Sequence, residues 1–152
     1  MTAIAFYHLQ RTTLEAALPK LLEKVLEDGM RALVVAGSNE RVESLNATLW
    51  TFDSQSFLPH GSGKDGAPES QPILLTTDLG SNPNSAHVLL HVDMAFLNNF
   101  NGFYRVLDVF DGNDSVPLAA ARERWKSLKT QGHDLTYWQQ SDSGGWQKSD
   151  TD

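Results

Sequence analysis

Apolar residues along this chain fall into two patterns, short continuous runs and longer segments with helical spacing. Helical spacing is clearest over 14–26, after a capping-box pattern in which Thr12 precedes Glu15 by three residues. Pro19 lies inside this segment and predicts a kink or an early end of the helix. Two more helices are predicted, one over 116–130 and one capped by Ser38 or Asn39, with an apolar face of Val42, Leu45, Leu49 and Trp50. The continuous runs predict buried strands at 3–9, 31–37, 72–77, 87–92, 104–110 and 135–139.

Predicted strands alternate with predicted helices at both the start and the end of the chain. This order is typical of an α/β fold with a mostly parallel central sheet and helices on both faces. We predict one such domain over residues 1–140, and a polar, flexible tail over 141–152. A Gly-rich polar loop is expected at 61–71, and one or two helical turns at 95–100.

Composition narrows the class of protein. The chain has 152 residues, of which 40% are hydrophobic and 20% charged, an ordinary balance for one globular domain. It has no cysteine, which excludes disulfides and thiolate chemistry. No apolar stretch approaches the ~20 residues of a membrane helix, and the N-terminus does not resemble a signal peptide. We therefore expect a cytoplasmic location.

Motifs that would mark a catalytic centre fail on spacing. The GSGK sequence at 61–64 has too few residues between its glycines for a phosphate-binding loop, and Pro68 prevents a following helix. His87 and His91 have the spacing of a zinc helix, but they lie in a predicted strand, where they are ~13 Å apart. The sequence therefore predicts no catalytic residue, no metal and no cofactor.

The helix predicted at 116–130 differs from the rest of the chain in charge. The segment 116–132 carries +3, whereas the whole chain carries −7. On a helical wheel, Arg122, Lys126 and Lys129 fall within an arc of about 60° and form a basic ridge. An apolar stripe borders this ridge, and Trp125 lies where the two meet. Such a border suits a ligand with carboxylates and one apolar group.

A simpler interpretation is also open, in which the ridge is a solvated basic face and Trp125 packs in the core. Direct binding of single-stranded DNA is a weaker alternative, because a net acidic domain attracts phosphates poorly. A nucleotide-binding or degenerate helicase-like domain is a further alternative. It is suggested only by the α/β order and the GSGK sequence, and a fold alone does not define a function.

Two pairs of motifs are shared with a known family. The first pair is LW at 49–50 and SFLPH at 56–60, and the second is ARERWK at 121–126 and GHDL at 132–135. In this order and separation they resemble the chi subunit of bacterial DNA polymerase III, and the similarity extends from the first strand to about Tyr137. The resemblance implies a Rossmann-like α/β sandwich without a catalytic or nucleotide site.

The resemblance also implies partners and site residues. Members of that family join the clamp loader through the psi subunit and bind the tail of single-stranded-DNA-binding protein, an acidic peptide that ends in Phe with a free carboxylate. Contact with DNA is then indirect. The tail-binding arginine, aromatic and lysine of the family match Arg122, Trp125 and Lys126.

Other matches to the family are less direct. A small apolar wall residue aligns with Phe110 across a one-residue gap. The family has a further lysine one helical turn before its arginine, which this chain lacks, and Lys129 is expected to compensate. Trp50 and Phe57 match motifs near the psi interface, although core packing explains large aromatic residues equally well.

Overall fold

Within the described part of the chain, the fold is a single sheet with three helices. A computed structural model describes residues 3–51, 61–62, 71–77, 82–92, 102–141 and 145–149. The strands are β1 (Ala3–Leu9), β2 (Ala32–Val35), β3 (Gly61–Ser62), β4 (Ile73–Thr76), β5 (Val88–His91), β6 (Arg105–Asp111), β7 (Asp134–Gln140) and β8 (Trp146–Ser149). The helices are α1 (Leu14–Glu27), α2 (Asn39–Thr51) and α3 (Ser115–Thr130). No described helix is long and apolar enough to cross a membrane.

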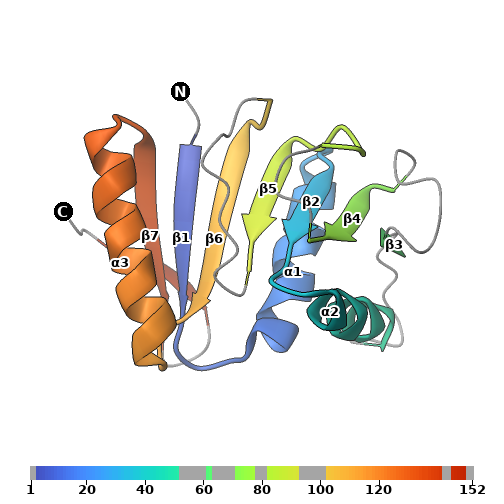
Figure 1. The fold of residues 1–152 in the computed structure, drawn as a ribbon, viewed down its shortest axis with the longest axis horizontal. Coiled ribbons are helices and arrows are strands. Elements are labelled where there is room, and N and C mark those ends of the chain that lie inside the picture. Colours follow the sequence, from blue (N-terminus) through green and yellow to red (C-terminus); the bar gives the residue numbers. More distant parts are fainter. Residues whose placement is uncertain are drawn as a thin grey trace.

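The strands form one sheet in the order β3-β4-β2-β5-β6-β1-β7-β8 (Figure 1). All neighbouring pairs are parallel except β7 and β8, which are antiparallel. The predicted α/β class with a mostly parallel sheet is therefore confirmed. Two strands were not predicted. The pair of residues in β3 is too short to give a pattern, and β8 lies within the segment predicted to be a flexible tail.

Helices cover both faces of the sheet, as predicted. One core cluster joins α1 and α2 to the sheet face that carries Val34, Leu90 and Leu107. The other joins α3 to the face that carries Ile4, Phe6 and Val106. Figure 1 shows α3 beside the β1 and β7 end of the sheet, with α1 and α2 toward the other end. The apolar runs of β2, β4 and β5 are buried on both faces, because the side chains of each strand alternate between the two core clusters.

Helix α1 differs in two ways from the helix that the sequence predicted. Thr13, and not Thr12, is the N-cap of α1, and its side chain accepts a hydrogen bond from the backbone N–H of Ala16. The helix continues through Pro19, which is buried within it, and therefore does not end early. Residues 95–100, predicted to form helical turns, lie outside the described part of the chain.

The chain leaves β1 and β6, which are neighbours in the sheet, toward opposite faces. The connection from β1 runs through α1 on one face, and that from β6 runs through α3 on the other. The carboxyl ends of β1 and β6 thus form the switch point at which open α/β sheets bind ligands most often. Because α3 follows β6, the start of α3 lies beside the end of β1.

Candidate functional site

Helix α3 is fixed at its start by a cap and along its length by an apolar stripe. The Asp114 side chain accepts a hydrogen bond of 3.1 Å from the backbone N–H of Val116. Ala121, Trp125 and Leu128 are buried against the sheet, as the helical wheel predicts. The opposite side of the helix therefore faces solvent, and its residues are available for contact.

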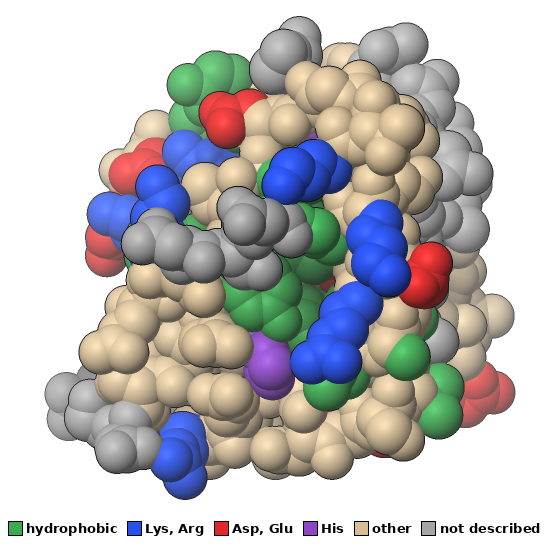
Figure 2. Space-filling model, turned by 90° about the vertical axis from the view of Figure 1, so that its left-hand side faces the viewer, with side chains coloured by type: hydrophobic (Ala, Val, Ile, Leu, Met, Phe, Trp, Pro, Cys, Tyr) green, Lys and Arg blue, Asp and Glu red, His purple; other side chains and the backbone are tan. Residues whose placement is uncertain are grey.

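The predicted basic ridge is confirmed as an exposed feature of α3. Arg122, Lys126 and Lys129 are all exposed. Figure 2, which views the α3 end of the molecule, shows Lys and Arg side chains along one border of a hollowed surface with hydrophobic side chains at its floor. Glu123 also belongs to this surface, because its carboxylate lies 3.6 Å from the Lys126 ammonium. It therefore does not lie apart from the ridge.

Arg124 points away from the ridge and into the protein. Its Nε donates to Asp108 Oδ2 at 2.6 Å, and a second guanidinium nitrogen donates to Oδ1 at 2.9 Å. Asp108 lies on β6 and its side chain is only 3% exposed. Burial raises the pKa of the Asp108 carboxyl, while the guanidinium acts in the opposite direction. The two-point contact sets the rotation of α3 on the sheet, and hence the direction in which the ridge faces.

Trp125 lies beneath the border between the ridge and the apolar stripe. It is 8% exposed. Its ring stands nearly perpendicular to those of Phe6 and Tyr137, with centroids 5.2 and 5.6 Å away. Among the described residues, its buried Nε1–H has no hydrogen-bond partner. Trp125 therefore contributes to the core in this structure, and its role as a wall for a ligand stays a prediction.

Phe110 belongs to the same aromatic cluster as Trp125, Phe6 and Tyr137. It is 3% exposed, and its ring lies 6.4 Å from Phe6 and 6.2 Å from Tyr137. The structure thus brings Phe110 and Trp125 together through shared neighbours, although they lie on different elements. Tyr137 is half-buried and is the member of the cluster that reaches furthest toward solvent.

His8, which the sequence did not nominate for this site, also joins this cluster. His8 Nδ1 lies 2.7 Å from the Tyr137 hydroxyl oxygen, and the His8 ring lies 5.2 Å from that of Phe110. Burial lowers the pKa of His8, and the Arg122 charge lowers it further. Burial raises the pKa of Tyr137, and the same arginine opposes that rise. Arg122 is thus close enough to act electrostatically on both groups.

The two residues predicted for a partner interface are not placed by the structure. Trp50 lies in the last turn of α2, where only the backbone is described, and Phe57 lies outside the described residues. Their proximity to each other, and their role at an interface, stay predictions.

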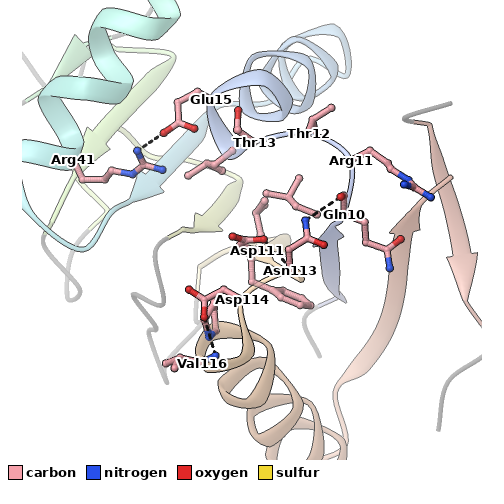
Figure 3. A pocket seen from close by; sticks show the side chains of 15 residues that line it. Gln10, Arg11, Thr12, Thr13, Glu15, Arg41, Asp111, Asn113, Asp114 and Val116 are labelled. Carbon is pink, nitrogen blue, oxygen red and sulfur yellow. Dashed lines mark hydrogen bonds and ion pairs between the residues drawn. The ribbon is translucent and has the colours of Figure 1, made fainter. Parts of the chain in front are cut away.

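A second hollow lies at the switch point, with a volume of about 640 Å³. It is lined by the ends of β1 and β6 and by the starts of α1 and α3, with Arg41 paired to Glu15 at one side (Figure 3). A nucleotide phosphate bound here would need the backbone N–H groups of the turn after β1. Those of Gln10, Arg11 and Thr12 instead donate to Gln140 Oε1, at 2.8, 2.7 and 3.2 Å.

The Gln140 side chain thus satisfies the N–H groups that a phosphate would need in this turn. Its Nε2 also donates to Thr12 Oγ1 at 2.8 Å, so both ends of the side-chain amide are held. The turn contains no glycine to let a diphosphate approach the backbone closely. This arrangement argues against the nucleotide-binding alternative.

The described features define an α/β protein whose clearest surface feature is a basic ridge beside an aromatic cluster, a combination suited to a peptide with carboxylates. Residues 1–136 match the family described as "DNA polymerase III chi subunit, HolC". The chain therefore belongs to the DNA polymerase III chi subunit family, as the paired motifs indicated.

Individual relatives agree with this assignment. The DNA polymerase III subunit chi of Escherichia coli is 24% identical over 142 residues, which cover 89% of this chain and 96% of that protein. That of Pseudomonas aeruginosa is 25% identical over 139 residues, covering 89% and 94%. A "Probable DNA polymerase III subunit chi" of Rickettsia prowazekii is 34% identical over 90 residues, or 59% of this chain and 54% of that protein.

Proposed function

We propose that this protein is an accessory subunit of DNA polymerase III that links the clamp loader, through a psi subunit, to the C-terminal tail of single-stranded-DNA-binding protein. Family membership supports the role in replication. The observation that carries the tail-binding part is the exposed basic ridge of Arg122, Lys126 and Lys129 beside the aromatic cluster on the sheet.

Charge explains why an acidic peptide would bind at this place. The chain as a whole carries −7, so most of its surface repels an acidic tail. The ridge reverses that field locally, and its three cations project from one side of a helix whose rotation is fixed by the Arg124–Asp108 pair. Contact with DNA is then indirect, through the binding protein.

The aromatic cluster would receive the terminal Phe of the tail. Arg122 and Lys126 hold the terminal carboxylate and the acidic side chains, and the Phe ring rests against the cluster of Tyr137, Trp125 and Phe110. Because Trp125 and Phe110 are nearly buried, the ring first meets the half-buried Tyr137. Seating it more deeply requires a small movement of the Trp125 side chain.

The protein would act without a catalytic centre, metal or cofactor of its own, in the cytoplasm. The competing nucleotide-binding function predicts micromolar binding of ATP–Mg²⁺. The occupied backbone N–H groups at the switch point favour the adaptor instead. Calorimetric titration with ATP–Mg²⁺ separates the two, because tight binding or turnover would contradict the adaptor function.

A psi subunit would contact Trp50 and Phe57, which match the family motifs for that interface. Affinity capture from the native cytosol tests both halves of the proposal, with single-stranded-DNA-binding protein and a clamp-loader subunit as the expected partners. Trp50→Ala should lose only the clamp-loader subunit, and Arg122→Ala only the binding protein.

A further inference from the structure

The contact between His8 and Tyr137 joins two strands at the edge of the aromatic cluster. His8 lies near the end of β1 and Tyr137 in the middle of β7, and these strands are parallel neighbours. The 2.7 Å contact between Nδ1 and the hydroxyl oxygen is the one described hydrogen bond of the Tyr137 side chain. The hydrogen bond between His8 and Tyr137 therefore sets the direction of the Tyr137 O–H bond.

Gly112 fixes the other side of the imidazole. The His8 ring makes a hydrogen bond with the Gly112 backbone that favours the protonated ring, as expected for a ring N–H donating to a carbonyl. A Cβ atom at Gly112 would lie 1.7 Å from His8 Cδ2 and Nε2, so only glycine leaves room for the ring. With Nε2 as the donor, the Nδ1 of neutral His8 accepts a hydrogen bond from the Tyr137 hydroxyl.

This hydrogen bond changes direction when His8 is protonated. The Nδ1–H then donates to the Tyr137 oxygen, and the hydroxyl proton becomes available to another acceptor. In the neutral state, by contrast, the phenol presents only lone pairs to the surface, which disfavours a nearby carboxylate. The site can therefore offer either an acceptor or a donor at the same position.

The charges around the pair come from two elements, α3 and β6. Arg122 of α3 acts on both groups, Asp111 of β6 acts on His8, and Asp108 of β6 acts on Tyr137. Arg122 opposes a positive His8 in the free protein. A carboxylate bound by Arg122 would neutralise that opposition and favour protonated His8.

We propose that Tyr137, oriented by His8, is a second donor to the carboxylate that Arg122 binds, and that His8 takes up a proton when this carboxylate arrives. This inference rests on the proposed tail-binding function. It adds to that function a second hydrogen-bond donor, Tyr137, and the uptake of a proton by His8. The complex binds more protons than the free protein, so affinity rises as the pH falls toward 6. The change cannot exceed about tenfold per pH unit, because one site takes up one proton.

Proton uptake gives a direct test. A synthetic acidic peptide ending in Phe is titrated into the full chain near pH 6.5 in PIPES and in Bis-Tris, which both buffer at this pH and have different ionisation enthalpies. The expected apparent enthalpies differ, in proportion to an uptake of more than zero and at most about one proton. The peptide with a C-terminal amide should bind more weakly and take up no proton.

Variants separate this role from a structural one. Tyr137→Phe keeps the ring and removes the hydroxyl, and should weaken binding about tenfold at pH 6 and much less at pH 8. His8→Gln should abolish proton uptake. His87→Gln, which changes the residue just before β5, should preserve it. Thermal unfolding of each variant identifies loss of folding.

The outcomes are distinguishable from failure of the proposed function. If the wild-type protein does not bind the peptide, the proposed function fails. If it binds tightly, but without proton uptake and equally well as Tyr137→Phe at both pH values, only this inference is overturned.

Discussion

Arg124 of α3 and Asp108 of β6 form a two-point ion pair beneath the basic ridge, with side chains that are 12% and 3% exposed. Three neighbouring cations of the same helix face solvent, so Arg124 is the one basic residue of α3 that serves the fold. The pair lies between the helix and the sheet at the level of Trp125. It therefore couples the orientation of the ridge to the position of the aromatic cluster.

Removing Arg124 should be strongly destabilising. Arg124→Ala leaves the Asp108 carboxylate buried without its cation, and the expected loss is about 3–5 kcal/mol in the free energy of unfolding. Asp108→Ala should cost less, because the guanidinium can reach solvent more easily than the carboxylate can. Urea unfolding of both variants measures the difference. Equal and small losses would show that the pair contributes little.

His91 predicts a second measurable property, the dependence of stability on pH. It lies opposite Asp108 in the sheet and is 1% exposed. Burial, aided by the Arg124 charge, lowers the pKa of the imidazole from 6.5 to about 3. The unfolded chain binds this proton below pH 6.5 and the folded chain does not. The contribution of neutral His91 to stability is therefore complete above pH 6.5 and is lost as the pH falls toward 3.

At pH 5 this loss should be about 2 kcal/mol relative to pH 7. The check is to compare the unfolding free energy at the two pH values in wild type and in His91→Gln, which lacks the titrating group. The variant should show a shallower pH dependence whatever its stability at pH 7. An unchanged slope in His91→Gln would mean that His91 is protonated in the folded protein.

The helices could be predicted because their apolar residues repeat with helical spacing, and the long strands because theirs form short continuous runs. The ridge could be predicted as well, since helical geometry alone fixes which side chains share a side. The inward direction of Arg124 could not, because it depends on an aspartate in a facing strand. His8 and Tyr137 are 129 residues apart, and only the order of strands brings them together. Strand β8 could not be predicted either, because the residues that follow Trp146 in it are polar. The ring of Trp146 packs 4.9 Å from that of Tyr7.

Gln140 should stabilise the turn after β1 through its side-chain oxygen. Gln140→Ala leaves three backbone N–H groups without this acceptor, and we expect a loss of about 1–3 kcal/mol in the free energy of unfolding. Gln140→Glu should recover most of it at pH 7, since a carboxylate accepts the same three hydrogen bonds. Thermal and urea unfolding of the two variants provide the measurement. If glutamate is no better than alanine, the N–H groups are satisfied in another way.

The basic ridge gives the prediction closest to function. Arg122→Ala should weaken binding of the acidic Phe-ending peptide about tenfold to a hundredfold, because a charge-assisted contact to a carboxylate contributes about 1.5–3 kcal/mol. Lys126→Ala should act in the same direction. Glu123→Ala should leave binding unchanged or slightly tighter, since Glu123 already lies 3.6 Å from the Lys126 ammonium and competes for it. Fluorescence or calorimetric titration measures each constant.

The matched control for Arg122→Ala is Lys20→Ala, which removes one exposed positive charge from α1. It makes the net charge more negative by the same amount, but away from the ridge. If net charge alone governed binding, both variants would weaken it equally. A local site predicts that only Arg122→Ala does so, and that added salt reduces binding only moderately, because part of the contact is apolar. Wild-type affinity in both Arg122→Ala and Trp125→Ala would place the peptide elsewhere on the protein.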